Sequence, residues 1–360
     1  MSDKPIEGLR RVFMTGNEVV AWAALAAEAD IMYGYPITPQ NEVMHYWTRL
    51  APKYGRSFLQ TEDEISAGFT TCGGVLAGKR AFTATAGPGN TLMQESITMA
   101  EMMRIPIVQV VQQRGGPSTA TVIYSQQEVT MTCYGGNGEG LRIVYSTSSH
   151  QELFDYTIKA FNVAWQHRFP TCVLGDGYQA KMRESLFIYD PAEKDIEMIK
   201  TYPFVGAEGK PGIEREPSHL RNTYNTEEEL NDVVNDLIKA YDAVASQVVE
   251  SQSFSTDDAD IVIIAHGVVT RAAQAAVQIL REKNIRAGHF RPVTLRPFPA
   301  GELKKIARTA KCFVVAESAQ GQLRKLVTDA IYGEKVPILD YYKPGKGITA
   351  EELVDYISKI

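Results

Sequence analysis

The stretch RAFTATAGPG at residues 80–89 joins a short apolar run to a turn of glycine and proline, and NTLMQESITMAEMM (90–103) then has the spacing of a helix. Apolar runs end in similar Gly- or Pro-rich turns at ADIMYGYP (29–36), RIPIVQVVQQRGGP (104–117) and PTCVLGDG (170–177). Such repetition of strand, turn and helix is typical of a parallel sheet covered by helices on both faces. Ligands of these sheets bind at the carboxyl ends of the strands, so we expect functional residues in the turns.

The later part of the chain has a different pattern. Residues 191–256 are rich in proline, glycine and charge, which predicts an extended connector. Within it, Thr226 and Glu229 have the spacing of a capping box for one amphipathic helix that reaches about residue 250. SQSFSTDDAD (251–260) is predicted to be a polar hinge. The sequence therefore predicts an α/β fold in three parts: a parallel-sheet domain (1–190), a connector (191–256) and a smaller α/β domain (257–360).

Composition and charge exclude several classes of protein. The 360-residue chain has a net charge of −6 and no basic cluster, which argues against nucleic acid or a membrane surface as a partner. No apolar run approaches the roughly 18 residues that span a bilayer, and we expect no secretion signal. The four cysteines form no CxxC motif, so we expect this chain to bind no metal and no iron–sulfur cluster of its own. A cytoplasmic protein with reduced thiols is therefore expected.

The turn YPITP at residues 35–39 follows a predicted strand, and its two prolines restrict the backbone. Such a stiff turn can present the hydroxyl of Thr38 and nearby N–H groups to an anion. The alternative is that Thr38 only caps the helix that follows.

Glu64 opens an apolar helical pattern that contains several small residues, EISAGFTTCGG (64–74). Acidic residues in a first helical turn ordinarily interact with the helix dipole. This surface, however, offers little that can solvate a charge. A carboxylate held there would have a raised pKa and could share a proton with a ligand nitrogen.

Two glycine-containing turns are further candidates. Gly87 and Gly89 allow the backbone to approach a ligand or a neighbouring chain closely. Arg114 stands between a strand and two glycines, which suits either bidentate binding of a carboxylate or a surface salt bridge. Neither TAGPG nor GGNGEG (135–140) has the spacing of a dinucleotide-binding GxGxxG motif. Gly175–Gly177 resembles the start of a magnesium–diphosphate motif but lacks the closing Asn, so it is predicted to be a strand-ending turn.

Taken in order, these motifs resemble those of one family. They are GNE (16–18), YPITP (35–39), EDEI (62–65), TAGPG (85–89) and QRGGPST (113–119), followed in the second domain by RPVTLRPFP (291–299) and AESAQGQL (316–323). The chain resembles the alpha subunit of the 2-oxoacid:ferredoxin oxidoreductases, in the version with separate subunits. The resemblance covers nearly the whole chain apart from the connector.

This resemblance implies a pyrimidine-type thiamine diphosphate domain followed by a smaller domain like the C-terminal domain of transketolase. It implies oxidative decarboxylation of a 2-oxoacid to an acyl-CoA in anaerobic metabolism, with CoA as co-substrate and ferredoxin as electron acceptor. The chain would share thiamine diphosphate with a beta subunit, which would hold the diphosphate, Mg²⁺ and an iron–sulfur cluster. Gamma and ferredoxin-like delta subunits would complete the complex, in which the 4Fe–4S clusters all lie on partner chains.

The resemblance also implies roles for individual residues. Glu64 corresponds to the catalytic glutamate that forms a hydrogen bond with N1′ of the aminopyrimidine and promotes removal of the C2 proton. Thr38 and Arg114 correspond to the pair that holds the carboxylate of the 2-oxoacid, with Ile37 as a further substrate-binding residue. The remaining residues assigned to the cofactor are Tyr35, Pro36, Gly87 and Gly89.

Some residues depart from the family's usual motifs. Ala86 stands where many relatives have Ser, and Asn137 and Glu139 replace a His and an Asp in a loop near the substrate. Branched-chain 2-oxoacids, 2-oxoglutarate and aryl 2-oxoacids such as phenylglyoxylate therefore all stay open as substrates. Two other functions also stay open: a different thiamine diphosphate-dependent decarboxylase or transketolase-like subunit, and a non-catalytic assembly subunit.

Overall fold

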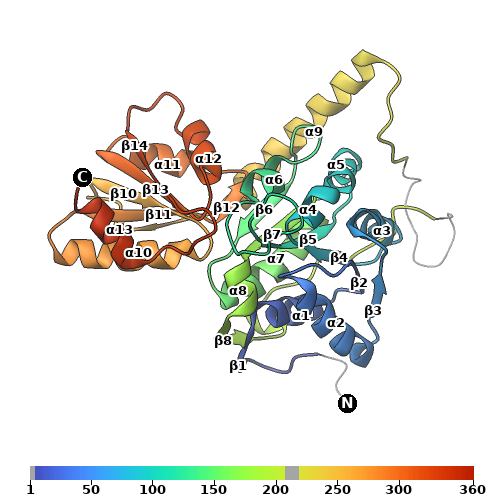
Figure 1. Ribbon diagram of the computed structural model, residues 1–360. Coiled ribbons are helices and arrows are strands. Elements are labelled where there is room, and N and C mark those ends of the chain that lie inside the picture. The colour runs from blue at the N-terminus through green and yellow to red at the C-terminus, as the bar shows by residue number, and fades with distance from the viewer. Residues whose placement is uncertain (1–4, 207–218) are drawn as a thin grey trace.

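The computed structural model describes residues 5–206 and 219–360 and shows two α/β bodies joined by a connector (Figure 1). The first body contains a seven-stranded sheet in the order β12-β6-β7-β5-β4-β2-β3. Neighbouring strands pair in parallel, except that β12 and β6 are antiparallel. The strands are β2 (Ile31–Gly34), β3 (Ser57–Gln60), β4 (Ala81–Thr85), β5 (Val108–Gln113), β6 (Ile143–Ser146), β7 (Thr171–Asp176) and β12 (Thr294–Arg296).

Helices cover both faces of this sheet, as the sequence predicts. One face packs against α1 (Gly16–Ala26), α2 (Asn41–Leu50) and α7 (His150–His167), and the other against α3 (Glu64–Leu76) and α5 (Gln94–Met103). Phe82 of β4 belongs to the first core and its neighbour Ala81 to the second, because side chains alternate along a strand. Strands β4, β5, β6 and β7 are buried along their whole length, as expected for parallel strands covered on both faces.

A separate two-stranded ribbon lies beside this sheet. The sequence predicts a strand for RVFMT (11–15), and β1 (Arg10–Thr15) forms there, but it does not join the parallel sheet. It pairs antiparallel with β8 (Arg183–Ile188). One face of the ribbon exposes Phe13 and Phe187, while the other face is packed on the protein. This alternation is typical of antiparallel strands with one face in solvent.

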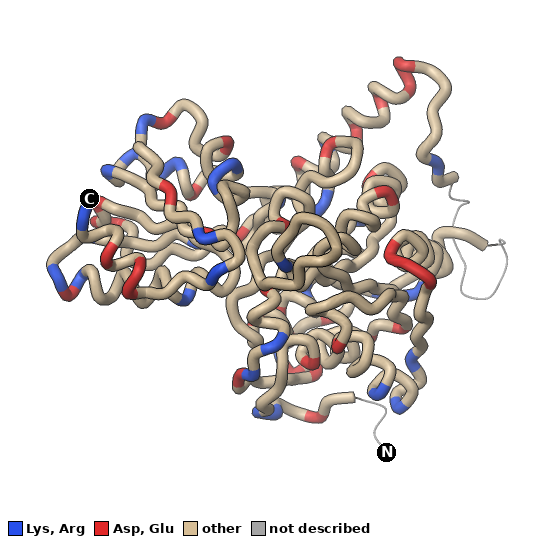
Figure 2. The backbone as a smooth tube through the Cα atoms, in the orientation of Figure 1, with Lys and Arg blue, Asp and Glu red and all other residues tan. Residues whose placement is uncertain are grey.

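The connector contains η2 (Pro191–Lys194), α9 (Glu227–Val248) and β9 (Ser251–Phe254), while residues 207–218 lie outside the described residues. The Thr226 hydroxyl caps α9 by accepting a hydrogen bond from the N–H of Glu229 at 3.2 Å. The Glu229 carboxylate, however, binds Arg221. The first half of α9 projects from the body and carries acidic residues (Figures 1 and 2). Its second half packs on the first body, where the Tyr241 hydroxyl donates a hydrogen bond to the carbonyl of Arg142 at 2.7 Å.

The second body is built on a five-stranded sheet in the order β14-β13-β10-β11-β9. The other strands are β10 (Ile261–Ile264), β11 (Ala287–Pro292), β13 (Cys312–Glu317) and β14 (Ile338–Tyr342). Helices α10 (Val269–Glu282) and α13 (Ala350–Ile357) pack on one face, and α11 (Ala300–Ala307) and α12 (Gln322–Ala330) on the other. The predicted hinge at 251–260 is wrong for Ser251–Phe254, which form β9. This edge strand is largely exposed, so its polar side chains suit it.

One strand and several hydrogen bonds connect the two bodies. Strand β12 leaves the second body to pair with β6 of the first, where Thr294 lies opposite Tyr145. The Gln126 side chain donates to the carbonyl of His266 at 2.9 Å. Asp176, at the end of β7, accepts a hydrogen bond from the N–H of Val268 at 2.6 Å, and burial raises the pKa of its carboxyl to about 6. β9 precedes residue 257 but belongs to the sheet of the second body, whereas β12 follows it and belongs to the sheet of the first. The domain limits drawn from the sequence stay predictions.

Two further observations concern the described residues. All four cysteines are buried and free of disulfides. No helix in the described part of the chain is long and apolar enough to cross a membrane.

Candidate active site

Three predicted functional turns meet at one edge of the seven-stranded sheet. The turn at 35–39 follows β2, residues 86–87 follow β4 and lead into the short helix α4 (Pro88–Leu92), and Arg114 comes directly after β5. Because β2 pairs with β4 and β4 with β5, all in parallel, the carboxyl ends of these strands lie side by side. Gln40, which follows the turn at 35–39, ties this turn to β4, because its side-chain amide donates a hydrogen bond to the carbonyl of Ala84 at 2.5 Å.

Glu64 reaches this edge from the start of α3. The preceding residue, Asp63, caps the helix by accepting a hydrogen bond from the N–H of Ser66 at 2.7 Å. Glu64 is only 6% exposed, and burial raises the pKa of its carboxyl, an effect that Asp63 increases and Arg114 opposes. Its Oε1 atom lies against Gly89, where a Cβ atom would stand 2.7 Å from it. The structure thus places a carboxyl group of raised pKa against the TAGPG turn.

Arg114 is buried at the same edge, so it is not a surface salt bridge. Its Nη1 donates a hydrogen bond to the carbonyl of Thr38 at 2.7 Å, and its Nη2 donates to the carbonyl of Thr119 at 2.9 Å. Its Nε is buried and has no partner among the described residues. Burial lowers the pKa of Arg114, but a guanidinium in a protein keeps its charge. Its remaining N–H groups suit the carboxylate of a ligand.

The two glycines of the TAGPG turn make room for these side chains. Gly87 has a positive φ of +53°, and a Cβ atom on it would stand 2.5 Å from Nε of Arg114. A Cβ atom on Gly89 would meet Thr85 Oγ1 at 2.3 Å as well as Glu64. The close approach expected at these glycines is therefore made by side chains of the site itself. Their part in cofactor binding stays a prediction.

Thr38 does not cap the next helix. The residue before α2 is Gln40, and no side-chain hydrogen bond caps the helix there. The contact between Thr38 and Arg114 is made by the backbone carbonyl, whereas the Thr38 side chain is exposed. Thr38 is thus held beside Arg114 by its backbone, and the residue is exposed to solvent.

The other residues of this turn surround Thr38. Pro36 is exposed, and Tyr35 and Ile37 are half-buried. Asn17, from the GNE motif, anchors the turn by donating a hydrogen bond to the carbonyl of Pro39 at 2.7 Å. The roles of Tyr35, Pro36 and Ile37 in binding stay predictions.

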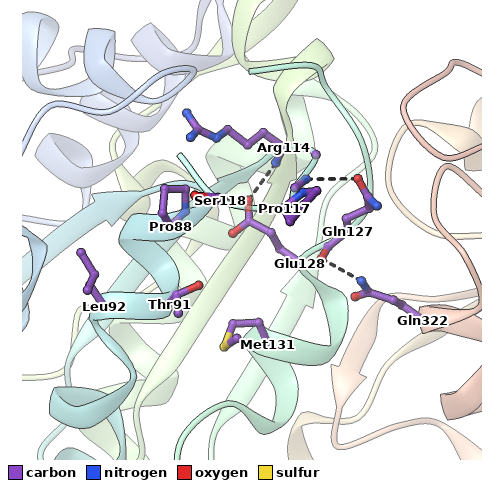
Figure 3. Close-up of a pocket in the computed structure, with 13 residues that line it drawn as sticks. Pro88, Thr91, Leu92, Arg114, Pro117, Ser118, Gln127, Glu128, Met131 and Gln322 are labelled. Carbon is purple, nitrogen blue, oxygen red and sulfur yellow. Dashed lines mark hydrogen bonds between the residues drawn. The ribbon is translucent and has the colours of Figure 1, made fainter. Parts of the chain in front are cut away.

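A cavity of about 560 Å³ opens beside Arg114 (Figure 3). Apolar side chains form much of its wall, among them Pro88, Leu92, Pro117 and Met131. Its charged lining groups are Arg114 and Glu128, and Gln322 from the second body closes one side.

Glu128 is a residue of the site that sequence reasoning missed. Its Oε1 atom accepts hydrogen bonds from the backbone N–H groups of Gly87 at 2.7 Å and Arg114 at 2.8 Å. Burial raises the pKa of this carboxyl to about 7, and these hydrogen bonds oppose the shift. The sequence signal was that residues 124–128 depart from the usual motif of the family the chain resembles, but no role was assigned to Glu128 itself.

These groups fit part of a cofactor and substrate site. A buried carboxyl of raised pKa, as at Glu64, suits a heteroaromatic ring nitrogen, and Arg114 with its unpartnered Nε suits a carboxylate. In the described residues, no group of three or more His, Cys, Asp or Glu side chains could hold a metal ion.

Fold and site together define a thiamine diphosphate-binding class of α/β protein. Residues 22–253 match the model of the thiamine diphosphate-binding domain of pyruvate flavodoxin/ferredoxin oxidoreductases, and residues 259–353 match core domain II of pyruvate:ferredoxin oxidoreductase. The chain therefore belongs to the 2-oxoacid:ferredoxin oxidoreductase family, in which it corresponds to the alpha subunit.

Individual relatives agree with this placement. The 2-oxoglutarate synthase subunit KorA of Methanocaldococcus jannaschii is 35% identical and aligns over 86% of this chain and 89% of its own. The ketoisovalerate oxidoreductase subunit VorB of Methanothermobacter marburgensis is 32% identical, over 86% of this chain and 87% of its own.

Solved structures agree as well. The 2-oxoglutarate:ferredoxin oxidoreductase from Magnetococcus marinus, with 2-oxoglutarate, coenzyme A and succinyl-CoA bound, matches with a TM-score of 0.87 and 25% identity. That match covers 97% of this chain and 65% of the other chain. A split-gene transketolase with a TM-score of 0.60 and 16% identity shares the fold alone.

Proposed function

We propose that this chain supplies the pyrimidine-binding half of the thiamine diphosphate site in a CoA-acylating 2-oxoacid:ferredoxin oxidoreductase. The observation that carries the proposal is the convergence of Glu64 and Arg114 on one edge of the sheet. One is a carboxyl of raised pKa and the other a cation with a free N–H group. When bound, thiamine diphosphate supplies the carbanion chemistry that decarboxylation of a 2-oxoacid needs.

Glu64 is proposed to bind N1′ of the aminopyrimidine. Burial raises the pKa of the Glu64 carboxyl, which makes it easier for this group to share a proton with a ring nitrogen, and Glu64 is held beside Gly89 at the start of α3. A hydrogen bond between a charged and a neutral partner contributes about 1.5–3 kcal/mol. Because Glu64 is almost fully buried, competition from water for this bond is small.

Arg114 and Thr38 are proposed to hold the carboxylate of the 2-oxoacid. Arg114 is fixed by two backbone carbonyls, so its remaining N–H groups are already oriented before substrate binds. The backbone of Thr38 binds this guanidinium, so its hydroxyl would be a further donor, and Ile37 would contact the acyl group. Tyr35, Pro36, Gly87 and Gly89 would surround the cofactor.

The acyl side chain of the substrate is proposed to be uncharged. The cavity beside Arg114 has apolar walls at Leu92 and Met131, and its second charged group is the Glu128 carboxylate. Among the described residues no second cation lines the cavity to pair with the distal carboxylate of 2-oxoglutarate, and the acidic Glu128 offers that carboxylate no charge of opposite sign. This chemistry favours a branched-chain or aryl 2-oxoacid.

The partner chains follow from the family. The relatives are named as subunits of 2-oxoacid oxidoreductases. We propose a beta subunit that holds the diphosphate, Mg²⁺ and a 4Fe–4S cluster, together with gamma and ferredoxin-like delta subunits that pass electrons to ferredoxin. The complex would work in the cytoplasm.

The test is to purify the chain with its natural partners and assay reduction of a low-potential dye with CoA and a panel of 2-oxoacids. We expect CoA-dependent activity, with kcat/KM higher for 2-oxoisovalerate or phenylglyoxylate than for 2-oxoglutarate. CoA-independent decarboxylation would instead indicate another thiamine diphosphate enzyme. Absence of activity with every 2-oxoacid would contradict the proposal and indicate an assembly subunit. Preference for 2-oxoglutarate would contradict only the uncharged side chain.

A further inference from the structure

Glu128 is the last residue before α6 (Val129–Tyr134), a position where an acidic side chain ordinarily caps its own helix. Its carboxylate makes no such bond. Oε1 instead accepts from the backbone N–H groups of Gly87 and Arg114, the second of which is seen in Figure 3. Oε2 accepts from the side-chain amide of Asn90 at 3.1 Å. A single carboxylate oxygen therefore joins the turns that follow β4 and β5.

The distance between these two turns determines where the guanidinium lies. Arg114 packs its Nε against Gly87, where there is no space for a Cβ atom. If the turn at Gly87 moved away from β5, the guanidinium would lose the surface on which it rests. Buried N–H groups that lose their acceptor also destabilise the turns that carry them.

We propose that Glu128 is a positioning residue of the 2-oxoacid site: it holds the turns after β4 and β5 at the separation that orients Arg114 toward the substrate carboxylate. This inference rests on the proposed function of Arg114. Both oxygens of Glu128 accept hydrogen bonds from protein donors, so we assign it the role of holding the turns and not that of binding the substrate carboxylate.

The second body holds the segment that carries Glu128. The side-chain amide of Gln322, the first residue of α12, donates to the carbonyl of Gln127 at 2.8 Å. Its oxygen accepts from the N–H of Thr130 at 2.9 Å. One glutamine thus binds the backbone on both sides of Glu128, so the second body contributes to the geometry of the site as well as to the wall of its cavity.

The experiment compares four variants of the assembled oxidoreductase. Glu128→Leu removes the acceptor, whereas Glu128→Gln keeps an Oε1 atom that can bind both N–H groups. Thr132→Val is the matched control, because Thr132 is buried in the same cluster and bonds only to Asn90 there. Gln322→Ala loosens the segment from the second body. Steady-state kinetics give KM for the 2-oxoacid and for CoA separately.

We expect Glu128→Leu to raise KM for the 2-oxoacid at least tenfold and to leave KM for CoA within twofold. KM for the 2-oxoacid should stay within about threefold of wild type in Glu128→Gln and within about twofold in Thr132→Val. In Gln322→Ala it should rise about threefold. A merely structural role would lower thermal stability without this split between the two substrates. If Glu128→Leu fails to assemble, the test of the proposal is Gln322→Ala. An unchanged KM for the 2-oxoacid in that variant overturns the proposal.

Two other results would also overturn the positioning role. One is an unchanged KM for the 2-oxoacid in folded Glu128→Leu, and the other is equal loss in the Leu and Gln variants. A wild-type complex inactive with all 2-oxoacids would overturn the proposed function. Hydrogen exchange would still test the link between the turns, because peptides containing Gly87 and Arg114 should exchange faster in Glu128→Leu than in Thr132→Val. Equal exchange in the two variants would contradict that link.

Discussion

The guanidinium of Arg114 and the backbone carbonyl of Thr38, 76 residues apart in the chain, are joined by a hydrogen bond of 2.7 Å. Through this bond the turn after β5 holds the turn after β2, and the Thr38 side chain stays free to face solvent. The proposed carboxylate-binding pair is therefore coupled by its backbone before any ligand arrives. Such pre-organisation lowers the cost of binding a substrate.

Replacement of Arg114 by lysine should reduce kcat/KM for the 2-oxoacid by about 10- to 100-fold, largely through KM. Lysine keeps the charge but lacks the planar fork that binds two carbonyls and a carboxylate together. Steady-state kinetics of the complex measure the effect. The control is Arg308→Lys, a largely exposed cation of the second body. An unchanged KM for the 2-oxoacid in Arg114→Lys would contradict the proposal that Arg114 binds its carboxylate.

Glu64→Gln should slow exchange of the C2 proton of bound thiamine diphosphate by about 10- to 100-fold, the equivalent of about 1.5–3 kcal/mol. The amide cannot exchange a proton with the ring nitrogen as a carboxyl does. Proton exchange followed by NMR after acid quench measures it in the complex. Glu62→Gln is the matched control, because Glu62 lies two residues away and is exposed. A normal rate of C2 proton exchange in Glu64→Gln would show that another group forms the hydrogen bond with N1′.

Gly87→Ala should lower activity at least tenfold, because the new Cβ would stand 2.5 Å from Arg114 Nε on a backbone with φ of +53°. Gly73→Ala is the control: Gly73 lies within α3 and a Cβ there meets nothing within 4 Å. This control should keep full activity and gain about 0.5–1 kcal/mol of stability. Dye reduction and thermal unfolding test both variants, and full activity in Gly87→Ala would refute the packing argument.

The titration of Glu128 should make stability depend on pH. Burial raises the pKa of this carboxyl in the folded chain from its ordinary 4.5 to about 7. The folded state thus favours the protonated form, so the stabilisation is complete below pH 4.5 and is lost as pH rises through 7. We expect the free energy of unfolding of wild type, relative to Glu128→Gln, to fall between pH 5 and 8. Urea unfolding of both proteins at pH 5 and pH 8 measures this difference. If the free energy of unfolding changes equally with pH in the two proteins, the raised pKa of Glu128 is contradicted.

Much of the fold was predictable because it depends on local patterns. Each parallel strand is a short buried run that ends in a turn, and each helix follows with its own periodicity, so the α/β class and the positions of Glu64 and Arg114 followed from the sequence. β9 was missed because an exposed edge strand has the composition of a hinge. The antiparallel pairing of β1 with β8 was missed because its partner lies more than 160 residues away.

The sequence by itself determined which turns meet at one edge of the sheet, since parallel strands bring their carboxyl ends together whatever the details of packing. Only the tertiary structure decided how those turns are held. Glu128 accepts hydrogen bonds from Gly87 and Arg114, and Gln322 forms hydrogen bonds with the backbone on both sides of Glu128. These bonds depend on distances between segments that are remote in the chain. No local propensity encodes such distances, because they arise when the whole core packs.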